Sequence, residues 1–196
     1  MGSEMCIRDS DTTPQTVVPI VERAVRLGVD GIKAELYPWC ERGDDHLGSY
    51  TGKETVMNMV NLSAECKKWG LPLMAEAIPF GWPGADKRTP EVTAAACRVA
   101  SETGADYVKS FYTGDKESFK TLVDNCSVPV LVLGGPKAKS DRDTLVMVRD
   151  AMDAGAVGIC IGRNIWGHDK IEAMTSALAA IIHDDASVDT ASKFID

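Results

Sequence analysis

Three ionisable side chains lie inside segments whose composition is typical of buried β-strands. Lys33, Glu76 and Lys109 are each surrounded by apolar, β-branched or aromatic residues. Burying a charge is costly unless the charge is paired or used, so three such residues indicate either a structural ion-pair group or a reactive site. We favour a reactive site because two of the three are lysines. An amine whose pKa is lowered by burial and by a second cation becomes a nucleophile toward carbonyl groups.

Lys109 lies in the segment 105–115, which ends in a Gly-Asp turn. Strand side chains alternate between faces, so Tyr107, Lys109 and Phe111 are expected on one face, opposite Val108 and Ser110. Taken alone, a strand lysine more often extends along apolar neighbours to reach water. The other two charged strand residues change that interpretation and make Lys109 the candidate nucleophile.

A second group of residues is suited to binding an anion. Gly134-Gly135 and Gly162-Arg163 each follow a predicted strand, and Asn164 opens a short turn of helix. Glycines allow backbone N–H groups to approach phosphate oxygens closely. Each pair alone could be an ordinary turn, but the two pairs on the last two strands together predict a phosphate site. The loop cations Arg42 and Lys87 could reach a second phosphate, although loop cations are more often surface charges.

Strands and helices alternate along the chain. The expected strands lie at residues 31–37, 71–78, within 105–115, 128–133 and 157–161, and the expected helices at about 14–28, 53–69, 90–103, 116–126, 141–153 and 169–182. Thr13 is the expected N-cap of the first helix. Helix-to-strand connections are short, whereas several strand-to-helix loops are long and rich in Gly and Pro. This pattern predicts a parallel α/β fold and favours a (β/α)8 TIM barrel, whose strand-to-helix loops build the active site.

A doubly wound open sheet is the alternative fold, but no Gly-rich dinucleotide fingerprint follows the first expected strand. In a barrel, layers of inward side chains come from alternate strands, so Lys33 and Lys109 can share a layer. Glu76, on the strand between them, could then relay protons to and from a bound substrate.

The barrel is expected to be incomplete. A whole barrel has eight strands and about 250 residues, whereas five strands are recognisable among 196 residues. Residues 1–10 show neither helical nor strand periodicity and are interpreted as a non-native or disordered prefix. Residues 11–187 would form a partial barrel containing about strands 4–8, with the first three strands missing, and residues 188–196 a C-terminal tail. Two unpaired sheet edges would invite a homo-oligomer.

Composition excludes several classes of function. A net charge of −8 and a pI near 4.9 argue against binding nucleic acid or an anionic membrane surface. No apolar run is long enough for a membrane span. The six cysteines are scattered without a C-x-x-C pair, and the three histidines lie far apart. We therefore expect a cytoplasmic protein with reduced thiols, no metal site and no cofactor.

Three segments carry a family resemblance: A-D-Y-V-K-S-F-Y-T-G-D, V-P-V-L-V-L-G-G-P-K and G-I-C-I-G-R-N-I-W. Together they resemble the archaeal-type class I aldolases of the deoxyribose-phosphate, fructose-bisphosphate and tagatose-bisphosphate aldolase superfamily. The resemblance implies a metal-independent aldolase that makes or breaks a C–C bond in a phosphorylated ketose. It implies that Lys109 forms the Schiff base, and that Gly134, Gly135, Gly162 and Arg163 bind the substrate phosphate.

One departure from the family pattern bears on the substrate. The fructose-bisphosphate branch has Trp-x-Tyr-Pro-Arg on the strand before the Schiff-base lysine, whereas this chain has Glu76-Ala77-Ile78-Pro79-Phe80. A glutamate there, with G-I-K-A-E-L-Y on the preceding strand, is similar to the tagatose-bisphosphate and sulfosugar-phosphate branch. That similarity implies assisting roles for Lys33 and Glu76. The alternative function is a non-catalytic phosphate-ligand-binding barrel fragment, or an inactive truncated aldolase.

Overall fold

Six parallel strands form one sheet in the computed structural model, which describes residues 4–7, 14–41, 52–135 and 137–195. Each strand pairs in parallel with the next strand along the chain. The strands are β1 (Glu4–Ile7), β2 (Gly31–Leu36), β3 (Leu73–Ala77), β4 (Tyr107–Ser110), β5 (Val130–Leu133) and β6 (Gly158–Cys160). The strand order never reverses, as it would in a doubly wound sheet, so the expectation of a parallel α/β fold is confirmed.

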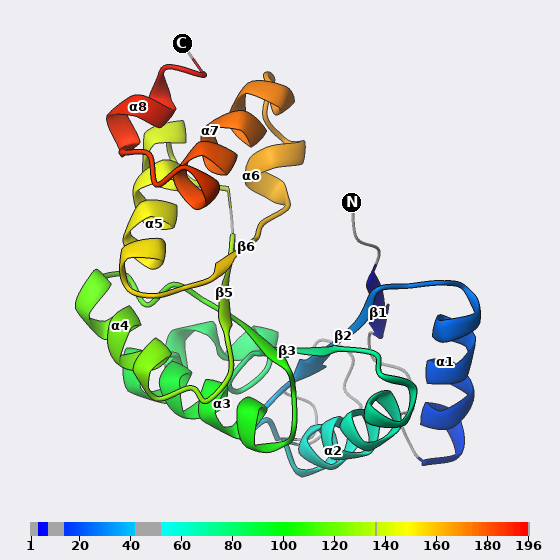
Figure 1. Ribbon diagram of the computed structural model, residues 1–196. Helices are drawn as coiled ribbons and strands as arrows, with labels where there is room; N and C mark the ends of the chain where they lie inside the picture. The colour runs from blue at the N-terminus through cyan, green and yellow to red at the C-terminus, as the bar shows by residue number, and fades with distance from the viewer. Residues whose placement is uncertain (1–3, 8–13, 42–51, 136, 196) are drawn as a thin grey trace.

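In the described part of the chain, five helices connect consecutive strands and lie along the outer side of the curved sheet, and three further helices follow the last strand (Figure 1). They are α1 (Pro14–Arg26), α2 (Gly52–Trp69), α3 (Pro90–Glu102), α4 (Lys116–Asp124), α5 (Asp141–Asp153), α6 (Arg163–Trp166), α7 (Ile171–His183) and α8 (Val188–Ser192). A short 3-10 helix, η1 (Trp82–Lys87), lies in the loop that follows β3. No helix among the described residues is both long enough and apolar enough to span a membrane.

Side-chain caps fix where three of the helices begin. Thr89 accepts a hydrogen bond from the N–H of Val92 at the start of α3, and Pro90 occupies its first turn. Asp115 and Ser140 cap α4 and α5 in the same way. These helices begin at the residues that the sequence predicts. Thr13, the expected cap of α1, lies outside the described residues.

The main core lies between the sheet and the outer helices. One face of β2 and β3 contributes Ile32, Ala34, Leu36, Leu73 and Ala75, all of which are buried. These residues alternate with Lys33 and Glu76, as the strand period requires. The side chains of Lys33 and Glu76 are also buried, so both faces of these two strands are shielded from water.

The N-terminal segment differs from the sequence prediction. Glu4–Ile7 forms β1 and pairs in parallel with residues 31–34 of β2, although the sequence pattern gives no strand before residue 31. The sheet therefore has six strands within the described residues, rather than five. A four-residue segment is too short to carry a readable period, and its strand conformation depends on pairing with β2.

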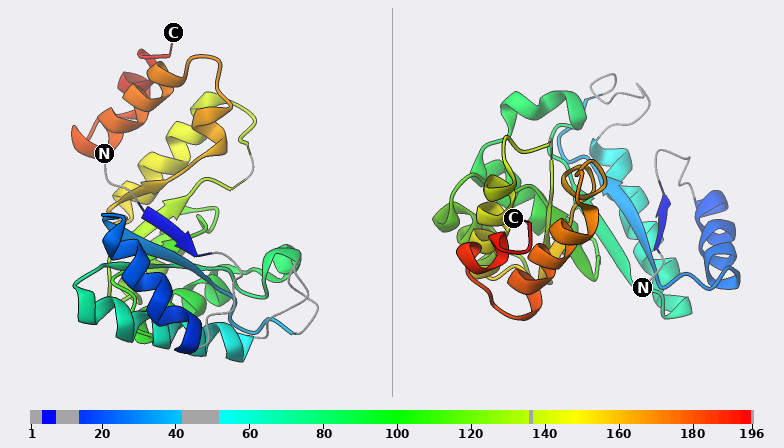
Figure 2. Two further views of the ribbon diagram at one scale, coloured as in Figure 1. Left: turned by 90° about the vertical axis from the view of Figure 1, so that its right-hand side faces the viewer. Right: turned by 90° about the horizontal axis from the view of Figure 1, so that it is seen from above.

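The C-terminal helices add a second, smaller core. Leu145 and Val148 of α5 pack with Met174 and Leu178 of α7, and Ala191 of α8 is buried among them. The two orthogonal views in Figure 2 place α7 and α8 beside α5. The expected tail of residues 188–196 therefore begins with a helix that packs against the rest of the fold.

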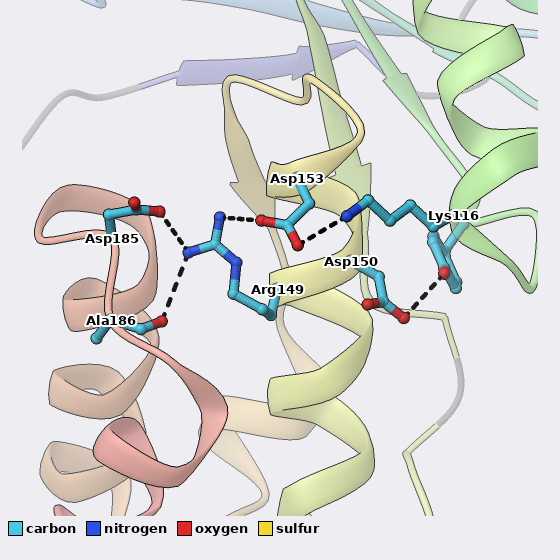
Figure 3. A network of polar contacts seen from close by, with 7 residues as sticks. Lys116, Arg149, Asp150, Asp153, Asp185 and Ala186 are labelled. Atoms are coloured by element: carbon cyan, nitrogen blue, oxygen red, sulfur yellow. Dashed lines mark hydrogen bonds and ion pairs between the residues drawn. The ribbon is translucent and has the colours of Figure 1, made fainter.

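A polar network joins α4, α5 and the turn between α7 and α8 (Figure 3). Arg149 contacts Asp153 within α5 and donates to Asp185 at 2.7 Å. Asp153 also forms an ion pair with Lys116 of α4, whose Nζ lies 3.0 Å from Oδ2 of Asp153. This chain of ion pairs attaches the C-terminal helices to the helices that cover the sheet.

Candidate functional site

The three charged strand residues meet at one carboxylate. The Nζ of Lys109 lies 3.0 Å from Oε1 of Glu76, and the Nζ of Lys33 contacts the other oxygen, Oε2. The side chains of Lys33 and Glu76 are only 7% and 5% exposed, and that of Lys109 is 15% exposed. Glu76 therefore bridges two ammonium groups in a nearly water-free setting.

The strand register explains how these side chains meet. Glu76 on β3 is paired with Lys109 on β4 and with Glu35 on β2. Lys33 is paired with Met74 instead, so the two lysines are offset along the sheet by two residues. A lysine side chain is long enough to span that offset, which is why both ammonium groups reach Glu76.

A second carboxylate belongs to the same cluster. Glu35 accepts a hydrogen bond from the Nζ of Lys33 at 3.1 Å and another from the hydroxyl of Tyr37. Glu35 is not among the site residues that the sequence predicts. The signal was present in the sequence, because Lys33, Glu35 and Tyr37 alternate along one strand and therefore share a face.

One pocket of about 300 Å³ collects the predicted site residues. Its lining includes all seven predicted residues, which are Lys33, Glu76, Lys109, Gly134, Gly135, Gly162 and Arg163. Glu35, Leu133 and Cys160 complete the lining among the described residues. The residues come from β2, β3 and β4 and from the chain that follows β5 and β6. The pocket thus brings the amine cluster and the two glycine turns together, and the role of each residue stays a prediction.

The two glycines after β5 have different reasons for being glycine. A Cβ on Gly134 would lie 2.6 Å from Cγ2 of Ile161, so the close approach of the chain after β6 leaves no room for a side chain. Gly135 has a φ of 57°, which lies in the left-handed region that side chains disfavour. Packing and backbone conformation therefore both shape this turn beside the pocket.

Asn164 ties the two glycine turns to each other. Its side chain is buried; Nδ2 donates to the carbonyl oxygen of Gly134 at 3.2 Å, and Oδ1 accepts from the N–H of Ala138 at 2.8 Å. The sequence identified Asn164 only as the start of a helical turn. A buried side-chain amide needs partners for its donors and its acceptor, but its contacts with the loop after β5 become visible only in the fold.

Aromatic residues cover the end of the strands that carry the cluster. Phe111, beyond Lys109, packs with Tyr37, Cys40 and Ile78. The guanidinium carbon of Arg88 lies 4.6 Å from the centre of the Phe111 ring, and burial lowers the pKa of Arg88. Phe111 thus contacts both this small cluster and Arg88.

Lys87, one of the two loop cations considered for a second phosphate, is not among the residues that line the pocket. The Nζ of Lys87 lies 5.7 Å from the centre of the Phe80 ring, and Arg42 lies outside the described residues. Among the residues whose placement is described, no group of three or more His, Cys, Asp or Glu side chains is arranged to hold a metal ion.

Comparison with known proteins decides the family. The model of the DeoC/LacD family aldolases matches residues 3–168. The chain belongs to this family. The match includes β1 and both groups of pocket residues.

Two archaeal enzymes are similar to this chain. The chain is 36% identical to 2-amino-3,7-dideoxy-D-threo-hept-6-ulosonate synthase of Halobacterium salinarum, over 92% of this chain and 64% of the relative. It is 35% identical to the class 1 fructose-bisphosphate aldolase of Thermoproteus tenax, over 83% of this chain and 59% of that enzyme. The chain thus spans about three fifths of the length of these relatives.

A solved structure of a relative includes a reaction intermediate. In an archaeal fructose-1,6-bisphosphate aldolase, the catalytic lysine is covalently bound to the carbinolamine intermediate of the substrate. That structure superimposes on this DeoC/LacD family chain with a TM-score of 0.74 and 34% sequence identity, covering 83% of this chain and 61% of the relative.

Proposed function

We propose that this chain belongs to a class I, metal-independent aldolase that makes or breaks a C–C bond in a phosphorylated ketose through a Schiff base on Lys109. The observation that carries the proposal is the contact between the Lys109 Nζ and Glu76, 3.0 Å apart, in a pocket that also contains both glycine turns. A neighbouring carboxylate can accept the proton that the amine must lose before it attacks a carbonyl.

In the proposed reaction, the neutral amine of Lys109 adds to the ketone carbon and forms a carbinolamine. Loss of water, with a proton supplied by the acid form of Glu76, then gives the iminium ion. In the cleavage direction, a base removes the proton from the hydroxyl of the departing carbon, and the electrons of the C–C bond move into the iminium to give an enamine. Protonation of the enamine and hydrolysis return the free amine. Lys33 contacts the other oxygen of Glu76 and so helps to position this carboxylate beside Lys109.

We assign the substrate phosphate to Gly134, Gly135, Gly162 and Arg163. The assignment is supported by their place in the same pocket as Lys109 and by the exposure of Arg163. Backbone N–H groups at glycine turns can approach phosphate oxygens closely, and arginine forms paired hydrogen bonds with phosphate. Holding the phosphate at this end of the pocket would orient the ketone toward Lys109.

We propose that the six strands are part of a (β/α)8 barrel. The consecutive parallel order and the outer helices support this architecture, as does the likeness to the archaeal aldolase. The unpaired outer edges of β1 and β6 within the described sheet support a homo-oligomer. Cys40, Cys66, Cys97, Cys126 and Cys160 are free thiols, which supports a cytoplasmic location. Sedimentation of the purified chain would test the oligomer, and a monomer at micromolar concentration would contradict it.

Borohydride trapping tests the proposed function. With dihydroxyacetone phosphate present, sodium borohydride should reduce the imine and add the mass of the reduced substrate to Lys109, as read by peptide mass spectrometry. Lys109→Met should abolish the adduct, whereas Lys120→Met, at an exposed lysine paired with Asp124, should leave it unchanged. An unlabelled Lys109 in folded protein would contradict the proposal. Binding of dihydroxyacetone phosphate without an adduct would favour a non-catalytic binder.

A further inference from the structure

We infer that Glu35 is a positioning residue of this site, which holds the ammonium of Lys33 so that Glu76 keeps one carboxylate oxygen for Lys109. The inference rests on the proposed role of Lys109 as the reacting amine. It assigns a task to a buried carboxylate that the proposed reaction steps do not use.

The two carboxylates contact the lysines differently. Lys33 lies between Glu35, at 3.1 Å, and Oε2 of Glu76. Glu76 lies between Lys33 and Lys109. The four groups therefore form a chain of alternating charge: Glu35, Lys33, Glu76, Lys109. Without the first member, Lys33 would lose one of the two carboxylates that it contacts here and would compete more strongly with Lys109 for Glu76.

Glu35 is itself held in place by hydrogen bonds on the side away from Lys33. The hydroxyl of Tyr37 donates to Oε2 of Glu35, leaving Oε1 directed at Lys33. Tyr37 is buried, and its backbone N–H donates to the hydroxyl of Thr55 in α2 at 3.2 Å. Thr55 in turn donates to the carbonyl oxygen of Gly52 at 3.1 Å. The position of Glu35 is thus fixed through the start of α2.

The charges around the cluster allow the effect on Lys109 to be given a sign. The titratable or charged groups that line the pocket or its aromatic cover, among the described residues, are Lys33, Glu35, Tyr37 and Cys40 on β2 or just after it, Glu76 on β3, Arg88 after η1, Lys109 on β4, Cys160 on β6 and Arg163 on α6. Removing the negative charge of Glu35 makes this surrounding more positive. A more positive surrounding favours the neutral amine at lower pH.

Reductive methylation of lysines measures this effect without any substrate. Formaldehyde with cyanoborohydride labels neutral amines, and peptide mass spectrometry gives the labelling of Lys109 as a function of pH. In Glu35→Gln, the pH midpoint for Lys109 should fall by about 0.5 pH unit or more. The midpoint for exposed Lys120 should not change. A midpoint for Lys109 within 0.2 pH unit (roughly the precision expected of such a titration) of wild type would overturn the inference.

A second variant keeps the test decisive if Glu35→Gln does not fold. Lys33→Met combined with Glu35→Leu removes both charges, and replacing a buried ion pair by apolar residues is commonly tolerated. This variant removes the cation that shares Glu76 with Lys109, together with the more distant anion. The Lys109 midpoint should therefore rise, opposite to the shift in Glu35→Gln. An unchanged or lowered midpoint in the folded double variant would overturn the inference.

Trapping rates add a readout that a merely structural role would not move in the same way. At a pH above the Lys109 midpoint, where the amount of neutral amine does not limit the rate, Glu35→Gln and Lys33→Met should each slow imine trapping with dihydroxyacetone phosphate, because each disturbs the position of Glu76. Combining them should slow it no further than Lys33→Met alone, because Glu35 acts through Lys33. If the rate losses of the two single variants multiplied in the combined variant, the inference would be contradicted. If wild type forms no imine, the proposed function fails, whereas the methylation midpoints still decide the role of Glu35.

Discussion

Glu76 and Lys109 face each other across the ladder between β3 and β4, with the lysine Nζ 3.0 Å from Oε1 of the glutamate. The pairing follows from register: the two residues are direct neighbours on adjacent strands, so their side chains leave the sheet on the same face. A second ammonium, from Lys33, holds the other carboxylate oxygen. The geometry therefore fixes which atom of Glu76 is available to Lys109.

Glu76→Gln should separate proton transfer from simple packing. The amide has nearly the same shape but cannot accept and return a proton, so imine formation should slow by about 10²- to 10³-fold. Rapid-quench borohydride trapping with dihydroxyacetone phosphate measures the rate. Glu102→Gln is the matched control, because Glu102 is 59% exposed and pairs only with Arg98 on its own helix in the described contacts. Near-normal trapping in Glu76→Gln would rule out the proposed proton relay.

Asn164→Ala should weaken binding of the substrate phosphate. Loss of its hydrogen bonds to Gly134 and Ala138 would leave two backbone groups without their partner and loosen the turn after β5. We expect KM for a phosphorylated ketose to rise by about 5- to 10-fold. Trapping of unphosphorylated dihydroxyacetone on Lys109 should be unchanged, since it does not use the phosphate site. An equal loss with both compounds would indicate a general folding defect instead.

The sequence predicts the parts of the site that depend on strand periodicity, and it misses those that depend on tertiary contact. Lys33, Glu76 and Lys109 could be identified because a charge inside an apolar strand is unusual whatever the fold. Asn164 could not, because an asparagine after a Gly-Arg turn is an ordinary loop residue until its amide is seen to join two turns.

Glu35 and β1 illustrate two further limits. Glu35 shares the face of Lys33, but only the register that aligns it with Glu76 shows that it belongs to the cluster. The strand β1 has four residues and acquires its conformation by pairing with β2. Helix starts were predictable because their signals are local: Thr89, Asp115 and Ser140 act on the first turn of their own helices.

Gly134→Ala should destabilise the protein through one identifiable contact. The new methyl group would lie 2.6 Å from Cγ2 of Ile161, and such overpacking costs about 1–3 kcal/mol. Combining it with Ile161→Ala removes the two nearest obstructing atoms, Cγ2 and Cγ1 of Ile161. We expect the cost of Gly134→Ala, measured by urea unfolding, to be smaller in the Ile161→Ala background than in wild type. Equal costs in the two backgrounds would show that something other than this contact requires the glycine.

Two cysteines should resist alkylation in the folded protein. Burial raises the pKa of Cys97 to about 12 and that of Cys66 to about 11, so neither forms much thiolate at pH 8. Because the thiolate is the reactive species, iodoacetamide should leave both residues unmodified until the chain is unfolded in urea. Peptide mass spectrometry before and after unfolding measures this. Rapid labelling of Cys97 in folded protein would contradict its burial beneath the sheet.

Asp153 should make stability depend on acidity. Burial acts to raise the pKa of its carboxyl group, but hydrogen bonds from Lys116 and Arg149 outweigh it and hold the pKa below the ordinary value of 3.8 (Figure 3). The unfolded chain therefore binds this proton more readily than the folded chain does. The stabilisation is complete above the ordinary value and is lost as the pH falls through the folded-state pKa. Because the side chain is 36% exposed, solvent screening limits the contribution to about 0.5–1 kcal/mol.

Asp153→Asn should lose this amount of unfolding free energy near pH 7, and the difference in unfolding free energy between variant and wild type should shrink below about pH 3.8. Urea unfolding at several pH values, with exposed Asp169→Asn as the control, measures the difference; a difference that stays constant down to the most acidic pH would contradict the assignment.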